Sequence, residues 1–185
     1  TWCLVGSEMC IRDRTFSDIP IFPLKSIILP GGQFPLRIFE RRYLDMTRDC
    51  LKYNSGFVIA LTKTDSEYIS SVYDYACYVE IVDWSQLDGG LLGITVEGKK
   101  IVKLDDYSLN DSNLLIGDAV EINIGVDYLI PQKYQILSKF YKKIYPEIKA
   151  YIFHINPKYN DANWLGFRLI ECLPIELDDK ADLIS

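Results

Sequence analysis

The stretch from Ile19 to Tyr43, IPIFPLKSIILPGGQFPLRIFERRY, constrains the fold of this chain more than any other feature of the sequence. It holds four of the eight prolines, a Gly-Gly pair and a run of Ile, Leu and Phe. Because proline breaks the interior of a helix, these apolar runs exclude one long helix. They predict two short extended segments, Ile19–Leu24 and Phe34–Phe39, joined by a tight Pro-Gly-Gly loop.

The chain up to about residue 128 is typical of a β-rich structure. Its further apolar or alternating runs are Phe57–Thr62, Tyr75–Trp84, Leu91–Glu97, Lys100–Leu104 and Asp118–Val126. Turns at Asp88-Gly89-Gly90 and Gly98-Lys99 and a polar loop at Asp105–Asn113 separate the later runs. Such spacing predicts a closed or nearly closed barrel, or a sandwich, and not a parallel sheet. The prolines of the first strand indicate an edge position.

Helical spacing appears once early and then dominates the end of the chain. Glu40–Lys52 predicts one early helix, with an apolar face made by Tyr43, Leu44, Thr47, Cys50 and Leu51. Pro131–Tyr145 predicts a second helix, which Pro146 interrupts, and Asp161 caps a third that ends at Pro174. We therefore expect a mainly β, α+β fold. A barrel part (residues 15–128) precedes a helical part (residues 129–185) that packs on it.

Both ends of the sequence are unusual. Residues 1–14, TWCLVGSEMCIRDR, show no periodicity, and VGSEMCIRDR resembles translated sequencing-adapter sequence. We expect this segment to be non-native or disordered, and exclude it from fold reasoning. An apolar helix face that stops abruptly at Leu183-Ile184 indicates a truncated C-terminus.

Composition excludes several classes of protein. The net charge of −6 would repel phosphate backbones and argues against nucleic acid as a partner. Apolar runs are too short to span a membrane, and no signal peptide is present, so we expect a cytoplasmic protein. The five cysteines are odd in number and lack metal-site spacing, which favours reduced, buried thiols.

Candidate catalytic and metal-binding residues are few, and we predict neither a catalytic residue nor a cofactor or metal. The single histidine, His154, lies in an apolar run typical of packing. The pairs Asp105-Asp106 and Asp178-Asp179 could bind a cation, but solvated turns and caps more often carry such pairs. Two charged clusters have alternative roles. Glu40 with Arg37, Arg41 and Arg42 is an ion-pair set or a ligand site; Lys139, Lys142, Lys143 and Lys149 are a solvated helix face or a nucleic-acid site.

The apolar loop Ile27–Pro35 is the best candidate for function. Exposed apolar patches often mark binding sites, so this loop is a candidate site for unfolded or extended peptide. The candidate residues are Ile28, Leu29, Pro30, Phe34 and Pro35. The alternative is that the loop plugs one end of the barrel.

The same region resembles the N-terminal substrate-binding domain of the ATP-dependent Lon proteases and the stand-alone proteins built from it. The signature is Ile19–Leu24, Pro30-Gly31 and Pro35–Tyr43, and looser similarity runs from about residue 17 to 180. The motif residues are Pro20, Phe22, Pro23, Gly31, Phe39, Glu40, Arg42 and Tyr43. The resemblance implies a PUA-like β-barrel followed by a helical bundle. It implies binding and not hydrolysis, because the chain has no phosphate loop and is too short for the proteolytic domain.

The sequence therefore supports, first, a non-enzymatic module that binds unfolded or extended polypeptide as an adaptor for an ATP-dependent protease. The alternative is an RNA- or nucleotide-binding PUA-like module, which rests on fold analogy alone. An enzyme with an unrecognised site is the third hypothesis, and the residue inventory argues against it. Clients and oligomeric state do not follow from the sequence.

Overall fold

The computed structural model describes residues 15–63, 71–125, 128–149 and 157–184. The predictions for residues 1–14 and for His154 fall outside these ranges. The strands are β1 (Thr15–Leu24), β2 (Gln33–Ile38), β3 (Phe57–Thr62), β4 (Val72–Gln86), β5 (Leu92–Leu109) and β6 (Leu115–Glu121). The α-helices are α1 (Arg41–Tyr53), α2 (Gln135–Ile148), α3 (Ala162–Cys172) and α4 (Leu177–Asp182). Single turns of 3₁₀ helix, η1 (Asp88–Gly90) and η2 (Gln132–Tyr134), precede β5 and α2.

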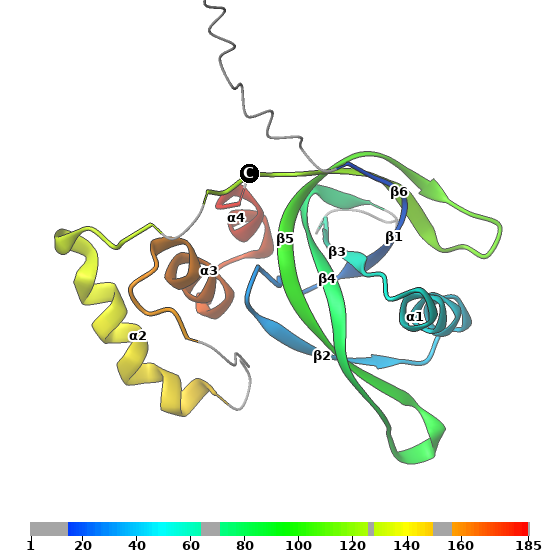
Figure 1. The fold of residues 1–185 in the computed structure, drawn as a ribbon, viewed down its shortest axis with the longest axis horizontal. Helices are drawn as coiled ribbons and strands as arrows, with labels where there is room; N and C mark the ends of the chain where they lie inside the picture. Colours follow the sequence, from blue (N-terminus) through cyan, green and yellow to red (C-terminus); the bar gives the residue numbers. More distant parts are fainter. Residues whose placement is uncertain (1–14, 64–70, 126–127, 150–156, 185) are drawn as a thin grey trace, which may run out of the picture.

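The strands form one mixed sheet that closes on itself (Figure 1). Their order is β2-β5-β4-β3-β1-β6, and a further pairing of β5 with β6 completes a ring. The first half of β5 pairs with β2 and the second half with β6. Only β1 and β3 run parallel; the other pairings of named strands are antiparallel. The structure therefore agrees with the predicted mainly β class, and the ring agrees in part with the predicted barrel.

The prediction of an edge position for the first strand is wrong, because β1 lies between β3 and β6. The prolines of β1 are compatible with two neighbouring strands because β6 and β3 pair with different halves of β1. Pro20 pairs with β6, whereas Pro23 pairs with β3, and only Ile21 pairs with both. Each proline thus has a paired strand on one side alone, so its missing N–H costs no ladder hydrogen bond on the other side.

Strand β5 is longer than the sequence pattern predicts. The expected turn at Gly98-Lys99 does not exist, and the chain continues through it as strand. The register against β4 instead shifts at this point, which marks a β-bulge. Asp105 and Asp106 likewise belong to β5, and the loop that was expected there is confined to the residues after Leu109.

Helix α1 covers the ring on the side away from the later helices (Figure 1). It buries Tyr43, Met46, Thr47 and Cys50, whereas Leu51, expected on the same face, is exposed. The ring of Tyr43 contacts that of Phe22 at 4.4 Å between centroids. Asn54 adopts the left-handed conformation and ends the helix.

The later helices lie on the other side of the sheet, with α3 and α4 beside it and α2 beyond α3 (Figure 1). Tyr141 of α2 packs on Trp164 and Leu165 of α3. The Asp161 side chain accepts a hydrogen bond from the Trp164 backbone and caps α3, as predicted. The predicted interruption at Pro146 is wrong, because α2 continues through it to Ile148. The predicted helical bundle is not confirmed: α2 packs on α3, and α4 is joined to α3 by a hydrogen bond from Lys180 Nζ to the Glu171 carbonyl at 3.2 Å.

Candidate functional site

The loop between β1 and β2 lies between the sheet and α3 (Figure 1). Ile28 is 3% exposed and belongs to the main core of the sheet. Leu29 is 1% exposed and packs with Ile101 of β5 against Phe167 and Ile170 of α3. For these two side chains the structure agrees with the alternative that the loop is buried: Ile28 packs in the sheet core, and α3 covers Leu29.

Two charged side chains of α3 hold the backbone of this loop. The Arg168 guanidinium donates from Nη2 to the carbonyl oxygens of Leu29 (3.0 Å) and Pro30 (3.2 Å). The same nitrogen donates to Oε1 of Glu171 at 2.8 Å. That carboxylate oxygen also accepts the Leu29 backbone N–H at 2.9 Å. Five polar groups of the loop and the helix are thus joined by hydrogen bonds; we call this set the loop clamp.

Burial dominates the electrostatics of the loop clamp. The Arg168 side chain is fully buried, and its Nε and Nη1 atoms have no hydrogen-bond partner among the residues that the structure describes. Burial raises the pKa of the Glu171 carboxyl to about 7, and the neighbouring Arg168 charge opposes this rise. A buried pair of this kind does not by itself stabilise a fold, but removing one partner leaves an uncompensated charge.

Glycines allow the loop to lie this close to its neighbours. A Cβ at Gly98 would lie 2.4 Å from the Leu29 carbonyl oxygen, and one at Gly32 would lie 2.8 Å from Glu171 Oε1. Gly31 has a positive φ of 81° and donates its N–H to the Gly98 carbonyl at 2.8 Å. The Pro-Gly-Gly loop thus joins the bulged part of β5 to α3.

The remaining motif residues position the start of α1. Glu40 stands at the N-terminus of the helix and pairs with Arg42 at 2.7 Å. Arg42 also donates to the Asn113 carbonyl at 2.6 Å, which ties this junction to the loop before β6. Arg41 pairs instead with Asp45, and Arg37 makes no ion pair within the described ranges. Phe39 has no packing role of this kind, since it is 69% exposed.

A cleft of about 320 Å³ opens beside the loop clamp. The described residues that line it are Ser26, Ile27, Ile28, Gln33, Phe34, Ile148, Glu171 and Cys172. The cleft therefore brings Ile28 and Phe34 together, whereas Leu29, Pro30 and Pro35 do not line it. Phe34 is half-buried and packs on the sheet core, and Pro35 is exposed on β2. We call this cavity the Phe34 cleft.

One polar atom of the Phe34 cleft is available to a ligand. Oε1 of Glu171 is used by the loop clamp, whereas Oε2 has no hydrogen-bond partner among the described residues. Apolar walls with a few convergent polar groups are typical of binding pockets. The arrangement can accept an apolar side chain together with one hydrogen-bond donor.

The described residues offer little for covalent or metal chemistry. Burial raises the pKa of the Cys172 thiol to about 11 and that of Cys77 to about 12, so neither is activated as a thiolate. No group of three potential metal ligands occurs in the described ranges. Asp178 and Asp179 stand in the first turn of α4, a position that favours carboxylates.

Comparison with known proteins identifies the family. The sequence model of the ATP-dependent protease La (Lon) substrate-binding domain matches residues 18–184. The chain belongs to this family. The match confirms the resemblance seen in the Ile19–Tyr43 signature, and it extends the similarity through α4.

A solved structure of a Lon N-terminal domain protein has the same fold. The Lon N-terminal domain protein from Xanthomonas campestris is 26% identical, with a TM-score of 0.76 over 92% of this chain and 90% of that one. The N-terminal domain of the Mycobacterium avium complex Lon protease is 15% identical, with a TM-score of 0.49 over 74% of this chain and 68% of that one. No curated protein matches the chain.

Sequence reasoning missed the loop clamp of this Lon substrate-binding domain. Its signal was present, because Arg168 falls on the helical face that also holds Trp164, Leu165 and Cys172. A charged residue on an apolar face needs a buried partner. Glu171, one turn later, was the available candidate.

The part of the chain that the structure describes contains no helix with the length and apolar character needed to cross a bilayer.

Proposed function

We propose that this chain is a non-enzymatic module that binds unfolded or extended polypeptide in the Phe34 cleft. The match to a protease substrate-binding domain over residues 18–184 is the observation that carries the proposal. The substrates of a protease are polypeptides, and an ATP-dependent protease is the candidate partner to which the module delivers them. Action in the cytoplasm is part of the same proposal.

The chemistry of the Phe34 cleft supports this function. Ile27, Ile28, Phe34 and Ile148 supply apolar walls, and the volume suits one or two side chains of a client. A client backbone N–H or side-chain donor can reach Oε2 of Glu171. Since most unfolded segments carry apolar side chains next to backbone donors, such a cleft recognises them with little sequence preference.

The free side of β2 supports an extended client. In the described ranges β2 pairs with β5 alone. The Gly98 N–H donates to the Gly32 carbonyl, so alternation directs the backbone groups of Phe34 and Leu36 toward β5. The backbone groups of Gln33 and Arg37 then point away from the sheet, and Pro35 between them lacks an N–H. An extended peptide can pair with this edge while a side chain enters the cleft.

Two alanine variants test the proposal. Phe34→Ala removes an apolar wall of the cleft, and Phe39→Ala removes the same side chain from an exposed position at the end of β2. Binding is measured by fluorescence anisotropy with a labelled, reduced and permanently unfolded protein. We expect Phe34→Ala to weaken binding by roughly tenfold or more, as truncation of a central contact does, and Phe39→Ala to leave it unchanged. Thermal unfolding shows that both variants are folded at the assay temperature.

Two results would count against the proposal. Equal affinities for wild type and a folded Phe34→Ala would exclude the cleft as the site. Tight, salt-sensitive binding of an RNA oligonucleotide without binding of the unfolded protein would favour the nucleic-acid alternative.

A further inference from the structure

Helix α2 carries an apolar surface that the Phe34 cleft does not use. Leu129 is 81% exposed, Ile136 71% and Phe140 53%. Ile136 and Phe140 are four residues apart and therefore share one face of the helix. The opposite face buries Tyr141 against α3, and it buries Ser138, whose hydroxyl donates to the Tyr159 carbonyl at 2.8 Å. Single exposed apolar residues are ordinary, but several on one helix indicate an interaction site.

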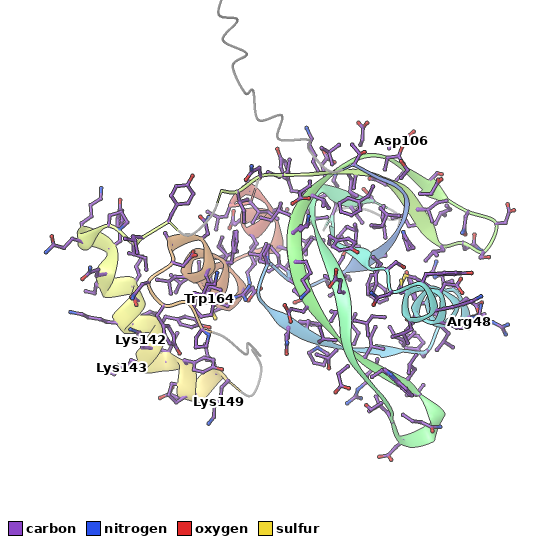
Figure 2. All side chains as sticks on the ribbon, in the orientation of Figure 1. Arg48, Asp106, Lys142, Lys143, Lys149 and Trp164 are labelled. Carbon is purple, nitrogen blue, oxygen red and sulfur yellow. The ribbon has the colours of Figure 1, made fainter. Side chains whose placement is uncertain are left out.

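Lysines surround this apolar surface. Residues 128–160 contain six lysines and one acidic residue, Glu147, which gives a net charge of +5 in a chain whose net charge is −6. Figure 2 shows Lys142, Lys143 and Lys149 along α2, with Trp164 between α3 and α2. We define the α2 surface by Leu129, Ile136, Phe140, Lys139, Lys142 and Lys143.

Lys139, Lys142 and Lys143 form no ion pair with the residues that the structure describes. No carboxylate of the described residues lies within 4.0 Å of Lys139, Lys142 or Lys143. The Lys142 ammonium lies instead 4.9 Å from the centre of the Tyr159 ring. A cation over an aromatic ring keeps its capacity to pair with an anion. The α2 surface is thus apolar with a mainly positive rim, in which Asp161 beside the first cleft and Glu147 on α2 are the nearby acidic residues among those described.

The surface is grooved and not flat. Two clefts of about 360 Å³ each run beside α2, and both are lined by Leu129, Lys142 and Asn160. Lys158 lines the first cleft and Lys139 the second. Side chains of a polypeptide can enter such grooves, whereas a planar lipid surface cannot. Exposed Leu, Ile and Phe also fit apolar side chains better than a phosphate backbone.

From this combination we infer that the α2 surface docks a partner protein through a segment in which Asp or Glu alternates with large apolar residues. The apolar anchors of the segment pack on Ile136 and Phe140, and its carboxylates pair with Lys139 and Lys142. Charge complementarity of this kind mainly determines specificity and the rate of association. The inference does not depend on the Phe34 cleft, which is lined by other residues and binds without a charge requirement.

A designed peptide tests this inference with the full chain. The probe is a fluorescein-labelled amphipathic peptide of Glu, Asp, Leu and Phe, and its controls replace either the acids by Lys or the apolar residues by Ser. We expect the acidic apolar probe to bind, with affinity that falls as NaCl rises, and both control peptides to bind at least tenfold more weakly. The Lys139→Glu, Lys142→Glu double variant should weaken the probe at least tenfold. The matched reversal Lys52→Glu, Lys63→Glu on the sheet part should have no effect.

The proposal is overturned by equal binding of the probe to wild type and to the double variant, or by equal binding of the basic peptide. It is also overturned if the double variant weakens binding of anionic lipid vesicles or of an RNA oligonucleotide and leaves binding of the probe unchanged. Sedimentation of the free protein tests whether a second copy of the chain occupies the α2 surface. A dimer that Ile136→Ser, Phe140→Ser dissociates would assign the α2 surface to a second copy of the chain. Binding of unfolded protein to the double variant tests the Phe34 cleft separately.

Discussion

At the residue scale, Gly98 shows why one position tolerates no side chain. It sits in the bulged part of β5, where the Leu29 carbonyl would lie 2.4 Å from an added Cβ. Because the contacted Leu29 oxygen belongs to the backbone, no change of side-chain rotamer can relieve the clash. Gly166 in α3 is the opposite case, because no atom lies within 4 Å of an added Cβ.

The two glycines give paired predictions. Gly98→Ala should lower the free energy of unfolding by about 1–3 kcal/mol, the usual cost of overpacking. Gly166→Ala should raise it by about 0.5–1 kcal/mol, because alanine is the better helix former. Urea unfolding of both variants provides the measurement. Equal effects would mean that the close approach of the loop to β5 is absent in solution.

Glu171 predicts a pH dependence with a definite sign. Its pKa is about 7 in the folded chain and 4.5 in the ordinary reference state, because burial disfavours the charged form. Between these values the folded state holds a proton that the unfolded state has lost. The carboxyl therefore contributes stability below pH 4.5, and this contribution is lost as the pH rises through about 7.

Glu171→Gln should remove this dependence, since the amide mimics the protonated acid. The difference in free energy of unfolding between wild type and variant should fall by roughly 3 kcal/mol from pH 4.5 to pH 8. Glu97→Gln serves as a control, because the pH dependence that Glu97 contributes has the opposite sign. Burial alone would raise the pKa of Glu97, but hydrogen bonds from Lys99 and Gln33 lower it overall. The contribution of Glu97 is present at high pH and lost as the pH falls. Parallel pH profiles for wild type and Glu171→Gln would contradict the account of the loop clamp.

At the element scale, α3 is the connection between the two parts of the molecule. Arg168 and Glu171 hold the loop backbone, and Trp164 and Leu165 on the same helix pack on Tyr141 of α2. The loop between β1 and β2 is therefore an internal joint. Ser26, Ile27 and Ile28 of this loop line the Phe34 cleft, whereas Leu29 and Pro30 do not.

Breaking this joint should be costly. Arg168→Met leaves Glu171 buried without its partner, and we expect a loss of about 3–5 kcal/mol in the free energy of unfolding. The double variant Arg168→Met, Glu171→Met should recover part of that loss, because no charge remains buried. Arg48→Met on the exposed face of α1 is the control, with an expected change within about 0.5 kcal/mol. If Arg168→Met were as stable as wild type, the loop clamp would not contribute to the stability of the fold.

The sequence predicts elements better than it predicts their neighbours. Helix α1, the cap at Asp161 and most strands follow from local periodicity and capping, which act over a few residues. The position of β1 does not follow from local pattern, because β6 pairs with the first half of this strand and β3 pairs with its second half. Gly98 was expected in a turn, since glycine alone does not distinguish a turn from a close approach. The burial of Leu29 depends on α3, about 140 residues later in the chain, and local pattern contains no such information.

At the scale of the whole molecule, the two proposed binding sites, the Phe34 cleft and the α2 surface, lie on different parts of the surface. The Phe34 cleft is lined by the loop between β1 and β2, the start of β2 and the ends of α2 and α3, whereas the α2 surface is formed by Leu129 and by side chains along α2. One is mainly apolar with a single free carboxylate oxygen, and the other is apolar with a basic rim. A module with two such surfaces can hold a client and a partner protein at the same time.

The most direct test of the central claim maps where unfolded polypeptide binds. Amide chemical shifts of the ¹⁵N-labelled full chain are followed while an unlabelled, permanently unfolded protein is added. The account predicts that the shift changes concentrate on Ser26–Phe34, Ile148 and Cys172, and that Phe34→Ala abolishes them. Changes confined to the α2 surface or to the exposed tip around Trp84, with residues 26–34 unaffected at saturation, would contradict it.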